Sequence, residues 1–262
     1  MAANALLALA AGLRGAVLAR RARWVLSVAD EGFSPLAGAI AARLARRPHL
    51  VMVFDLWAEN AYAAPDRWLA ARLERRLWRS ASAVVVYCEE MAEHYRAKHG
   101  IDCAVIPTPI DPSPDPVEST RGEEVLVAGA IYWAQEDAVR RLLRAAPRAG
   151  LEVAVLGDER KLRARGLSGD HHEPALPARD FAARLRAAGI LFVGLSFDSP
   201  HPAVVRTATP ARFAEYMGSG VPMLVHAPAD AHVARYARRE HAAEVVDQAD
   251  DGAHAQQSTR GN

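Results

Sequence analysis

The sequence predicts an α/β protein built from parallel sheets and divided into two domains. Short, continuous apolar runs alternate with helical patterns along the chain, as expected for parallel strands that are joined by helices. One proline-rich segment interrupts this alternation near the middle. The 262 residues suffice for two modest α/β domains, and 51% hydrophobic with 24% charged residues is typical of a globular chain.

Nine runs have the length and apolar character of strands. Most lack interior polar residues, so we expect them to be covered on both faces in a doubly wound sheet. The predicted strands are Trp24–Ala29, Leu50–Asp55, Ala83–Cys88, Ala104–Pro107, Glu124–Ile131, Glu152–Gly157, Ile190–Ser196, Pro222–His226 and Glu244–Val246.

Helices are predicted between these strands from the spacing of apolar residues. Within Asp66–Arg79, leucines recur at every fourth position (Leu69, Leu73 and Leu77), and Glu136–Ala146 has the same one-sided pattern. Each stripe is suited to packing on a sheet.

The N-terminal residues 3–18 are mostly apolar, and basic residues follow them. A secretory signal carries its positive charge before the apolar run, and here Arg14 interrupts that run. The run is also too short for a membrane span. We therefore expect an ordinary amphipathic or buried helix.

Five prolines and no periodicity mark residues 107–122, which favours a hinge between the domains. The predicted organisation is an N-terminal domain at 1–110, a linker at 111–122, a C-terminal domain at 123–247 and a disordered tail at 248–262.

The net charge of +1 provides no general attraction to nucleic acid or an anionic membrane. The two cysteines, Cys88 and Cys103, have no metal-site spacing, which fits a reducing compartment. The run Asp170–Glu173 offers potential metal ligands, but adjacent residues rarely converge on one ion, so we expect a solvated surface loop. Arg72–Arg79 is interpreted as the solvated face of a helix, with contact to anionic lipid as the alternative.

The segment 206–228 carries the clearest chemical signal. Thr209 and Pro210 predict a helix start, with a hydroxyl at the N-cap and proline at the first position. The N-terminus of the predicted helix faces the carboxyl edge of the preceding strand, Ile190–Ser196. Open α/β sheets bind ligands at this edge, and the unpaired N–H groups of the helix favour a phosphate there. Arg212 adds positive charge, and Glu215 could accept hydrogen bonds from ribose hydroxyls. The local pattern alone also fits a capped helix with solvated side chains.

This segment resembles the nucleotide-sugar motif of the retaining GT-B glycosyltransferases (the group 1, family 4-like enzymes), read here as Pro210, Arg212, Glu215, Tyr216, Met217, Gly220 and Pro222. The resemblance implies two Rossmann-like domains. It implies that Glu215 holds the donor ribose and that the helix N-terminus, with Thr209, Pro210 and Ala211, holds the diphosphate.

Other segments are similar to the same family. Glu123–Ala145 resembles its first C-domain strand and glycine turn, which implies that Gly129 and Ala130 approach the donor phosphates. Phe54–Asn60 resembles a loop that lines the cleft, and Asp55 is the candidate catalytic carboxylate near the acceptor. Family members usually have further strands before Trp24–Ala29, so the resemblance implies a chain shortened at both ends, with an incomplete N-terminal domain.

The predicted function is transfer of a sugar from a nucleoside-diphosphate sugar to an unknown acceptor, a glycan or a lipid-linked molecule, in cell-envelope polysaccharide biosynthesis. No metal or other cofactor is expected, because helix dipole and arginine charge can stabilise the diphosphate. No nucleic-acid partner is expected, and the location is predicted to be cytoplasmic, with peripheral contact to the inner face of the membrane left open. The alternatives are a nucleotide-sugar epimerase of the same fold and a non-catalytic nucleotide-binding remnant.

Overall fold

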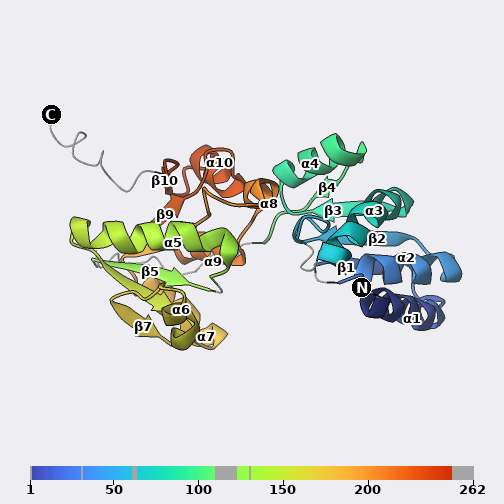
Figure 1. The fold of residues 1–262 in the computed structure, drawn as a ribbon, viewed down its shortest axis with the longest axis horizontal. Coiled ribbons are helices and arrows are strands. Elements are labelled where there is room, and N and C mark those ends of the chain that lie inside the picture. The colour runs from blue at the N-terminus through green and yellow to red at the C-terminus, as the bar shows by residue number, and fades with distance from the viewer. Residues whose placement is uncertain (1, 31, 61–63, 110–122, 130, 250–262) are drawn as a thin grey trace. The chain divides into compact units, whose positions relative to one another are not determined.

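The computed structural model describes residues 2–30, 32–60, 64–109, 123–129 and 131–249. Its contacts divide the chain into two compact units: Met1–Thr108 with Arg206–Ala208, and Pro109–Val205 with Thr209–Asn262. Each unit contains one parallel sheet, which confirms the predicted fold class (Figure 1). The predicted linker at 111–122 and most of the predicted tail, from residue 250 onward, lie outside the described residues.

The first unit has four parallel strands in the order β1-β2-β3-β4. They are β1 (Val25–Ala29), β2 (His49–Val53), β3 (Ala83–Val86) and β4 (Ala104–Val105). The helices are α1 (Ala2–Ala19), α2 (Ser34–Ala45), α3 (Ala64–Ser80) and α4 (Glu89–His99). All four strands therefore lie within or close to the runs that the sequence predicts.

This first sheet is not doubly wound. Each new strand is added on the same side of the last, and right-handed crossovers then place α2, α3 and α4 on one face. On β2, Val51 and Val53 are fully buried while the alternating Leu50 and Met52 are only half-buried, and Leu26 of β1 is 48% exposed. The expectation that strands are covered on both faces is wrong for this sheet, because an apolar run does not encode the order of the strands.

The predicted N-terminal helix is present as α1, but its burial differs from the expectation. Small residues face α2: Ala8 and Ala16 are buried, and a Cβ on Gly12 would lie 2.8 Å from Ile40 Cβ. Its large aliphatic side chains are exposed instead, namely Leu6, Leu7, Leu9, Leu13, Val17 and Leu18. Close helix packing on α2 through alanine and glycine decides this orientation. Among the described residues, no helix is long and apolar enough to cross a membrane.

The second unit has six parallel strands in the order β10-β9-β8-β5-β6-β7. The chain begins in the middle of the sheet, extends it in one direction, and then returns to the other side of its first strand. This sheet is doubly wound, with its switch point between β5 and β8. The strands are β5 (Glu124–Ala128), β6 (Glu152–Leu156), β7 (His171–Glu173), β8 (Ile190–Gly194), β9 (Met223–His226) and β10 (Glu244–Val246).

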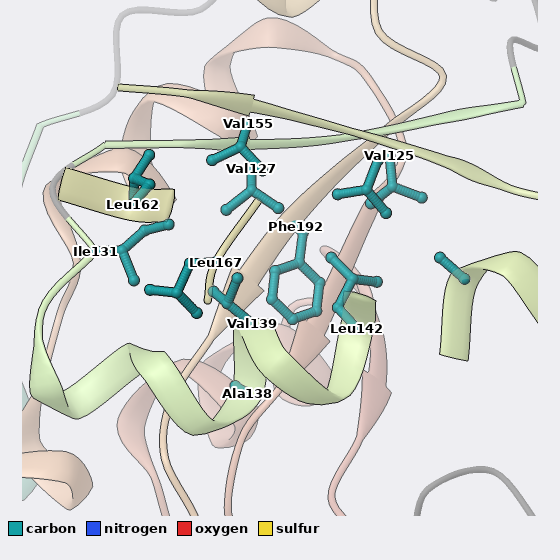
Figure 2. Close-up of a cluster of buried hydrophobic side chains, with 12 residues drawn as sticks. Val125, Val127, Ile131, Ala138, Val139, Leu142, Val155, Leu162, Leu167 and Phe192 are labelled. Atoms are coloured by element: carbon teal, nitrogen blue, oxygen red, sulfur yellow. The ribbon is translucent and has the colours of Figure 1, made fainter. Parts of the chain in front are cut away.

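Helices cover both faces of this second sheet, so its central strands are buried residue after residue. One core lies between α5 and the strands, where Val127, Val139, Leu142 and Phe192 pack together (Figure 2). The helices of this part of the chain are α5 (Trp133–Ala145), a 3-10 turn (Ala146–Ala149), α6 (Glu159–Ala164), α7 (Ala178–Arg186), α8 (Pro202–Thr207), α9 (Ala211–Ser219) and α10 (His232–Arg239).

The sequence missed β7, because Asp170–Glu173 was expected to be a solvated loop. His171–Glu173 pairs with β6 as an edge strand. The Asp170 carboxylate accepts the main-chain N–H of Val153 at 2.8 Å, and the Glu173 carboxylate binds the Arg184 guanidinium. A short polar edge strand has no apolar pattern to detect, and these long-range partners are what form it.

Candidate functional site

A cavity of the second unit lies at the carboxyl ends of β5 and β6. Its volume is about 370 Å³. A smaller cavity of about 20 Å³ lies nearer the switch point and shares Ala128, Ile131 and Arg212 with it. The larger cavity is lined by Ala128, Gly129, Ile131, Leu156, Gly157, Asp158, Lys161, Leu162, Arg165, Ala175, Leu176, Phe181 and Arg212.

The predicted glycine turn after β5 forms one wall of this cavity. Gly129 has φ of 118°, a conformation that side-chain-bearing residues rarely adopt. A Cβ at this position would also lie 3.3 Å from Arg212 Cγ. Both constraints favour glycine here, and they place the turn directly beside the start of α9. The other predicted residue of this turn, Ala130, lies outside the described residues.

The helix after Thr209 begins one residue later than predicted. Pro210 is its N-cap, with φ of −53° and ψ of 129°, and α9 starts at Ala211. Thr209 therefore lies outside the helix and does not cap it, which corrects the sequence prediction. No side chain caps this helix start. The Thr209 Oγ1 atom is buried and has no hydrogen-bond partner among the described residues. The first turn of α9 thus retains main-chain donors that an anion could use.

Tyr216 fixes α9 to the end of β5. Its hydroxyl accepts the N–H of Ala128 at 3.1 Å and donates to the carbonyl of the same residue at 3.2 Å. The ladder between β5 and β8 ends at Leu126 and Leu191, so the tyrosine meets the strand two residues beyond that pairing. Burial raises the pKa of Tyr216 to about 12, which keeps the hydroxyl protonated at every ordinary pH.

Arg212 and Glu215 lie together on the first turns of α9. The Arg212 guanidinium forms an ion pair with the Glu215 carboxylate, and both side chains are nearly half exposed. Arg212 also stacks over the Phe181 ring, with its central carbon 4.3 Å from the ring centroid. The arginine lines both cavities, as the sequence predicts for a phosphate ligand, whereas Glu215 lines neither.

Two further cations line the larger cavity, and sequence reasoning missed both. Arg165 donates to the carbonyl of Ile131 at 2.7 Å and pairs with Glu136, so it is held against the turn after β5. Lys161 lies on α6, which Asp158 caps by accepting the lysine's own N–H at 3.1 Å. Neither residue belongs to a motif, and only the fold of β6 and α6 brings them next to Gly129.

Asp55, the candidate catalytic residue, belongs to the first unit and follows β2. It is half-buried. Burial, and then the negative charge of Asp30, raise the pKa of its carboxyl above the usual value. Asp30 directly follows β1, so two carboxylates meet at the carboxyl edge of this sheet. Raised carboxyl pKa values are typical of functional sites, which keeps Asp55 as a candidate.

A scan against family models matches residues 2–109 with the glycosyl transferase 4-like domain. A search of curated proteins found no match. Among solved structures, the chain is similar to the lipopolysaccharide outer core galactosyltransferase WaaB, with 13% identity over 86% of this chain and 63% of WaaB and a TM-score of 0.54.

Two further solved structures have the same fold. HepE of Anabaena, in complex with UDP-glucose, has 18% identity over 82% of this chain and 62% of HepE, with a TM-score of 0.59. A glycosyltransferase from Rickettsia africae has 10% identity over 96% of this chain and 70% of its own length, with a TM-score of 0.62. The chain thus spans less than two thirds of WaaB and of HepE.

The fold and the cavity define an α/β protein with a ligand site at the carboxyl edge of a doubly wound sheet. Residues 2–109 match the glycosyl transferase 4-like domain, and the chain has the fold of the GT-B glycosyltransferases.

Proposed function

We propose that this protein is a glycosyltransferase that takes its sugar from a nucleoside-diphosphate sugar bound in the second unit. The observation that carries the proposal is the cavity of about 370 Å³ at the carboxyl edge of the second sheet, where Lys161, Arg165 and Arg212 converge. A diphosphate is the part of the donor that such a cationic edge would recognise. The GT-B relative HepE binds UDP and UDP-glucose, which supports a uridine donor.

The uncapped start of α9 supplies the second element of diphosphate recognition. Free N–H groups and the positive end of the helix dipole favour an anion there. The Thr209 hydroxyl, which is buried and has no partner within the described part of the chain, adds one polar group at the same helix end. These groups are fixed before the reaction, so they can stabilise the charge that develops on the departing diphosphate.

Glu215 and Arg212 exchange partners when the donor binds. A diphosphate competes with the Glu215 carboxylate for the Arg212 guanidinium, because both anions use the same donors. The released carboxylate then accepts hydrogen bonds from the ribose hydroxyls. Three protein cations and a helix N-terminus supply the positive charge at the diphosphate, so the proposal includes no metal ion.

The acceptor side of the reaction belongs to the first unit, with Asp55 as the proposed catalytic carboxylate. The acceptor class is a glycan or lipid-linked saccharide of the cell envelope, encountered at the cytoplasmic side of the membrane. The structurally similar protein WaaB, a lipopolysaccharide outer core galactosyltransferase, supports this class.

The test is incubation with UDP-, GDP- and dTDP-sugars, with and without candidate lipid-linked acceptors, followed by mass spectrometry of the sugar nucleotides and products. We expect sugar transfer that depends on the acceptor, and tightest binding to a UDP-sugar by calorimetry. Conversion of one sugar nucleotide into its epimer without an acceptor would show that the protein is an epimerase and not a transferase. Binding of a donor with no turnover for any acceptor would indicate a non-catalytic nucleotide-binding protein. Absence of binding to every donor would refute the proposal.

A further inference from the structure

The loop that carries Asp55 is buried immediately after that residue. Leu56, Trp57 and Ala58 are exposed by only 0, 2 and 4%. Loops usually lie on the surface, because buried main-chain N–H and C=O groups need partners that no strand or helix supplies. The Leu56 carbonyl accepts the N–H of Asn60 at 2.8 Å within the loop, but the amides of Trp57 and Ala58 need partners from elsewhere in the unit.

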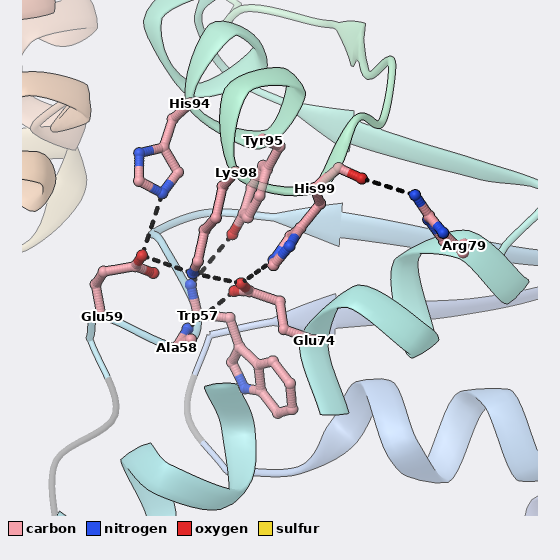
Figure 3. A network of polar contacts seen from close by, with 9 residues as sticks. All are labelled: Trp57, Ala58, Glu59, Glu74, Arg79, His94, Tyr95, Lys98 and His99. Carbon is pink, nitrogen blue, oxygen red and sulfur yellow. Dashed lines mark hydrogen bonds and ion pairs between the residues drawn. The ribbon is translucent and has the colours of Figure 1, made fainter. Parts of the chain in front are cut away.

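Two helices supply these partners (Figure 3). The Ala58 N–H donates to Glu74 Oε1 of α3 at 3.1 Å, and the Trp57 N–H donates to the Tyr95 hydroxyl of α4 at 3.3 Å. Two consecutive amides of a buried loop are thus held by side chains from helices that follow it in the sequence. The positions of these two side chains decide where the loop lies.

Glu74 is the centre of a charge network. It is fully buried, and its second oxygen, Oε2, lies 2.6 Å from both Lys98 Nζ and His99 Nε2. Lys98 also binds Glu59 Oε1 at 2.6 Å, and His94 contacts the same oxygen at 3.1 Å. Glu59 follows Ala58, so three consecutive loop residues are held by side chains of α3 or α4. The arginines around Glu74 in the sequence are exposed, as predicted for the solvated face of this helix, whereas Glu74 itself is buried.

The same loop is also connected to the strand end that carries Asp30. The indole N–H of Trp57 donates to the carbonyl of Gly32 at 2.8 Å, and the Trp57 ring packs edge-on against Phe33 at 5.6 Å. The loops after β1 and β2, which place Asp30 and Asp55, therefore have a common anchor.

Stability alone does not account for a buried carboxylate at this position. Burying ions costs several kcal/mol each, and well-packed apolar groups are often as stable as a buried ion pair. What a network of charges provides is one defined geometry, because each donor and acceptor must be satisfied. Here the network defines the position of the loop residues that lie two to four positions after Asp55.

We propose that Glu74 is a positioning residue for Asp55: through Ala58 and Lys98 its carboxylate fixes the loop 56–59, and thereby holds the Asp55 carboxylate beside Asp30 at the carboxyl edge of the first sheet. The consequence for sugar transfer rests on the proposed function, whereas the effect on the loop does not.

Glu74→Gln is the test variant, because the amide retains the length of the side chain but loses the charge that binds Lys98 and His99. Titration of the Asp55 carboxyl by NMR measures the effect without any substrate. We expect its apparent pKa to fall toward the ordinary value, since a loosened loop exposes Asp55 and moves it from Asp30. Amide hydrogen exchange at Trp57 and Ala58 should accelerate by about tenfold or more.

In the activity assay, Glu74→Gln should lower kcat by up to about 100-fold, since small misplacements of reacting groups cost rate on this scale. Nucleotide affinity and the donor KM should stay within about twofold, because the donor cavity belongs to the second unit. Arg96→Gln on α4 is the matched control, because it removes an exposed ion pair with Asp102 at 2.8 Å and does not touch the loop. We expect wild-type values for the control in every measurement.

Tyr95→Phe is the second variant, in case Glu74→Gln does not fold. It removes the acceptor of the Trp57 N–H and should shift the Asp55 titration in the same direction, to a smaller extent. A folded Glu74→Gln protein with an unchanged Asp55 titration and unchanged amide exchange would overturn the positioning role. If neither the wild-type protein nor Glu74→Gln transfers sugar, but the Asp55 titration shifts in Glu74→Gln, the positioning role stands and the proposed function fails.

Discussion

Replacement of Tyr216 by phenylalanine tests how the donor cavity is assembled. The ring is fully buried and Phe keeps its shape, so the change removes only the hydroxyl that bridges the N–H and C=O of Ala128. A net hydrogen bond between neutral groups is worth about 0.5–1.5 kcal/mol, and a donor left buried without a partner costs about 1–3 kcal/mol. The two bonds together predict a loss of about 2 kcal/mol in the free energy of unfolding of the second unit.

Urea denaturation gives this value directly, and Trp133 provides a fluorescence signal from the second unit, which contains no other tryptophan. We expect the loss to be constant between pH 6 and 9, because the pKa of Tyr216 is raised to about 12. The affinity for UDP should fall as well, since Tyr216 holds α9 against the residue that precedes Gly129.

The matched control is Tyr236→Phe in α10, whose hydroxyl has no hydrogen bond among the described residues. We expect the control to change stability by less than about 0.5 kcal/mol. If Tyr216→Phe were as stable as the control and bound UDP with wild-type affinity, the hydroxyl would not be what joins α9 to β5, and the account of the cavity would be refuted.

Three further predictions concern single carboxylates. Glu215→Ala should weaken nucleotide binding by at least tenfold in calorimetry while the melting temperature stays nearly constant, because this half-exposed side chain has an exposed ion pair as its structural role; unchanged affinity in a folded protein would remove Glu215 from the donor site. Asp55→Asn should raise stability at pH 7, because burial and the charge of Asp30 raise the pKa of this carboxyl and so penalise its ionised form. That gain should vanish as the pH falls below 3.8, the ordinary pKa of aspartate. Thermal melts across this pH range measure it, and a variant less stable than the wild type at pH 7 would contradict the prediction. Glu59→Gln should lower stability at pH 7. Burial would raise the pKa of Glu59, but hydrogen bonds and charges from His94 and Lys98 outweigh it and lower the pKa from 4.5 to about 2. This pKa difference corresponds to a stabilisation of at most roughly 3 kcal/mol, which is present above about pH 5 and is lost as the pH falls toward 2. Urea denaturation should therefore show Glu59→Gln to be less stable than the wild type at pH 7 and equally stable at pH 2.

Long-range contacts explain which parts of the candidate site could be found from the sequence. Arg212 was found because a charged helix start is a local pattern, and Gly129 because the glycine turn after the apolar strand resembles the turn of a known family. Lys161 and Arg165 were missed because they reach the cavity through the pairing of β6 with β5, and no local pattern encodes that pairing. The start of α9 was placed one residue early, because Pro210 fits both the first helical position and the N-cap.

The arginines of Arg72–Arg79 are exposed, as the sequence predicts, but two other burial features could not be predicted from local patterns. Glu74, within an arginine-rich helix, is fully buried, because Lys98 and His99 reach it from α4, about 25 residues later in the chain. The apolar N-terminal helix exposes its leucines, because its alanines and glycines permit a closer approach to α2. In both cases the partner, rather than the residue type, determines what is buried.

The sequence by itself determined most of the strands and helices, although not the polar edge strand β7, and it determined that the sheets are parallel. It also pointed to Gly129 and Arg212, which line the same cavity. These features depend on local spacing, on backbone preferences of glycine and proline, and on the apolar content of each run. Only the tertiary structure decided the order of the strands, the cations that surround the cavity and the buried charges beneath Asp55. Those depend on contacts between residues far apart in the chain, whose free energy exists only once the strands have paired.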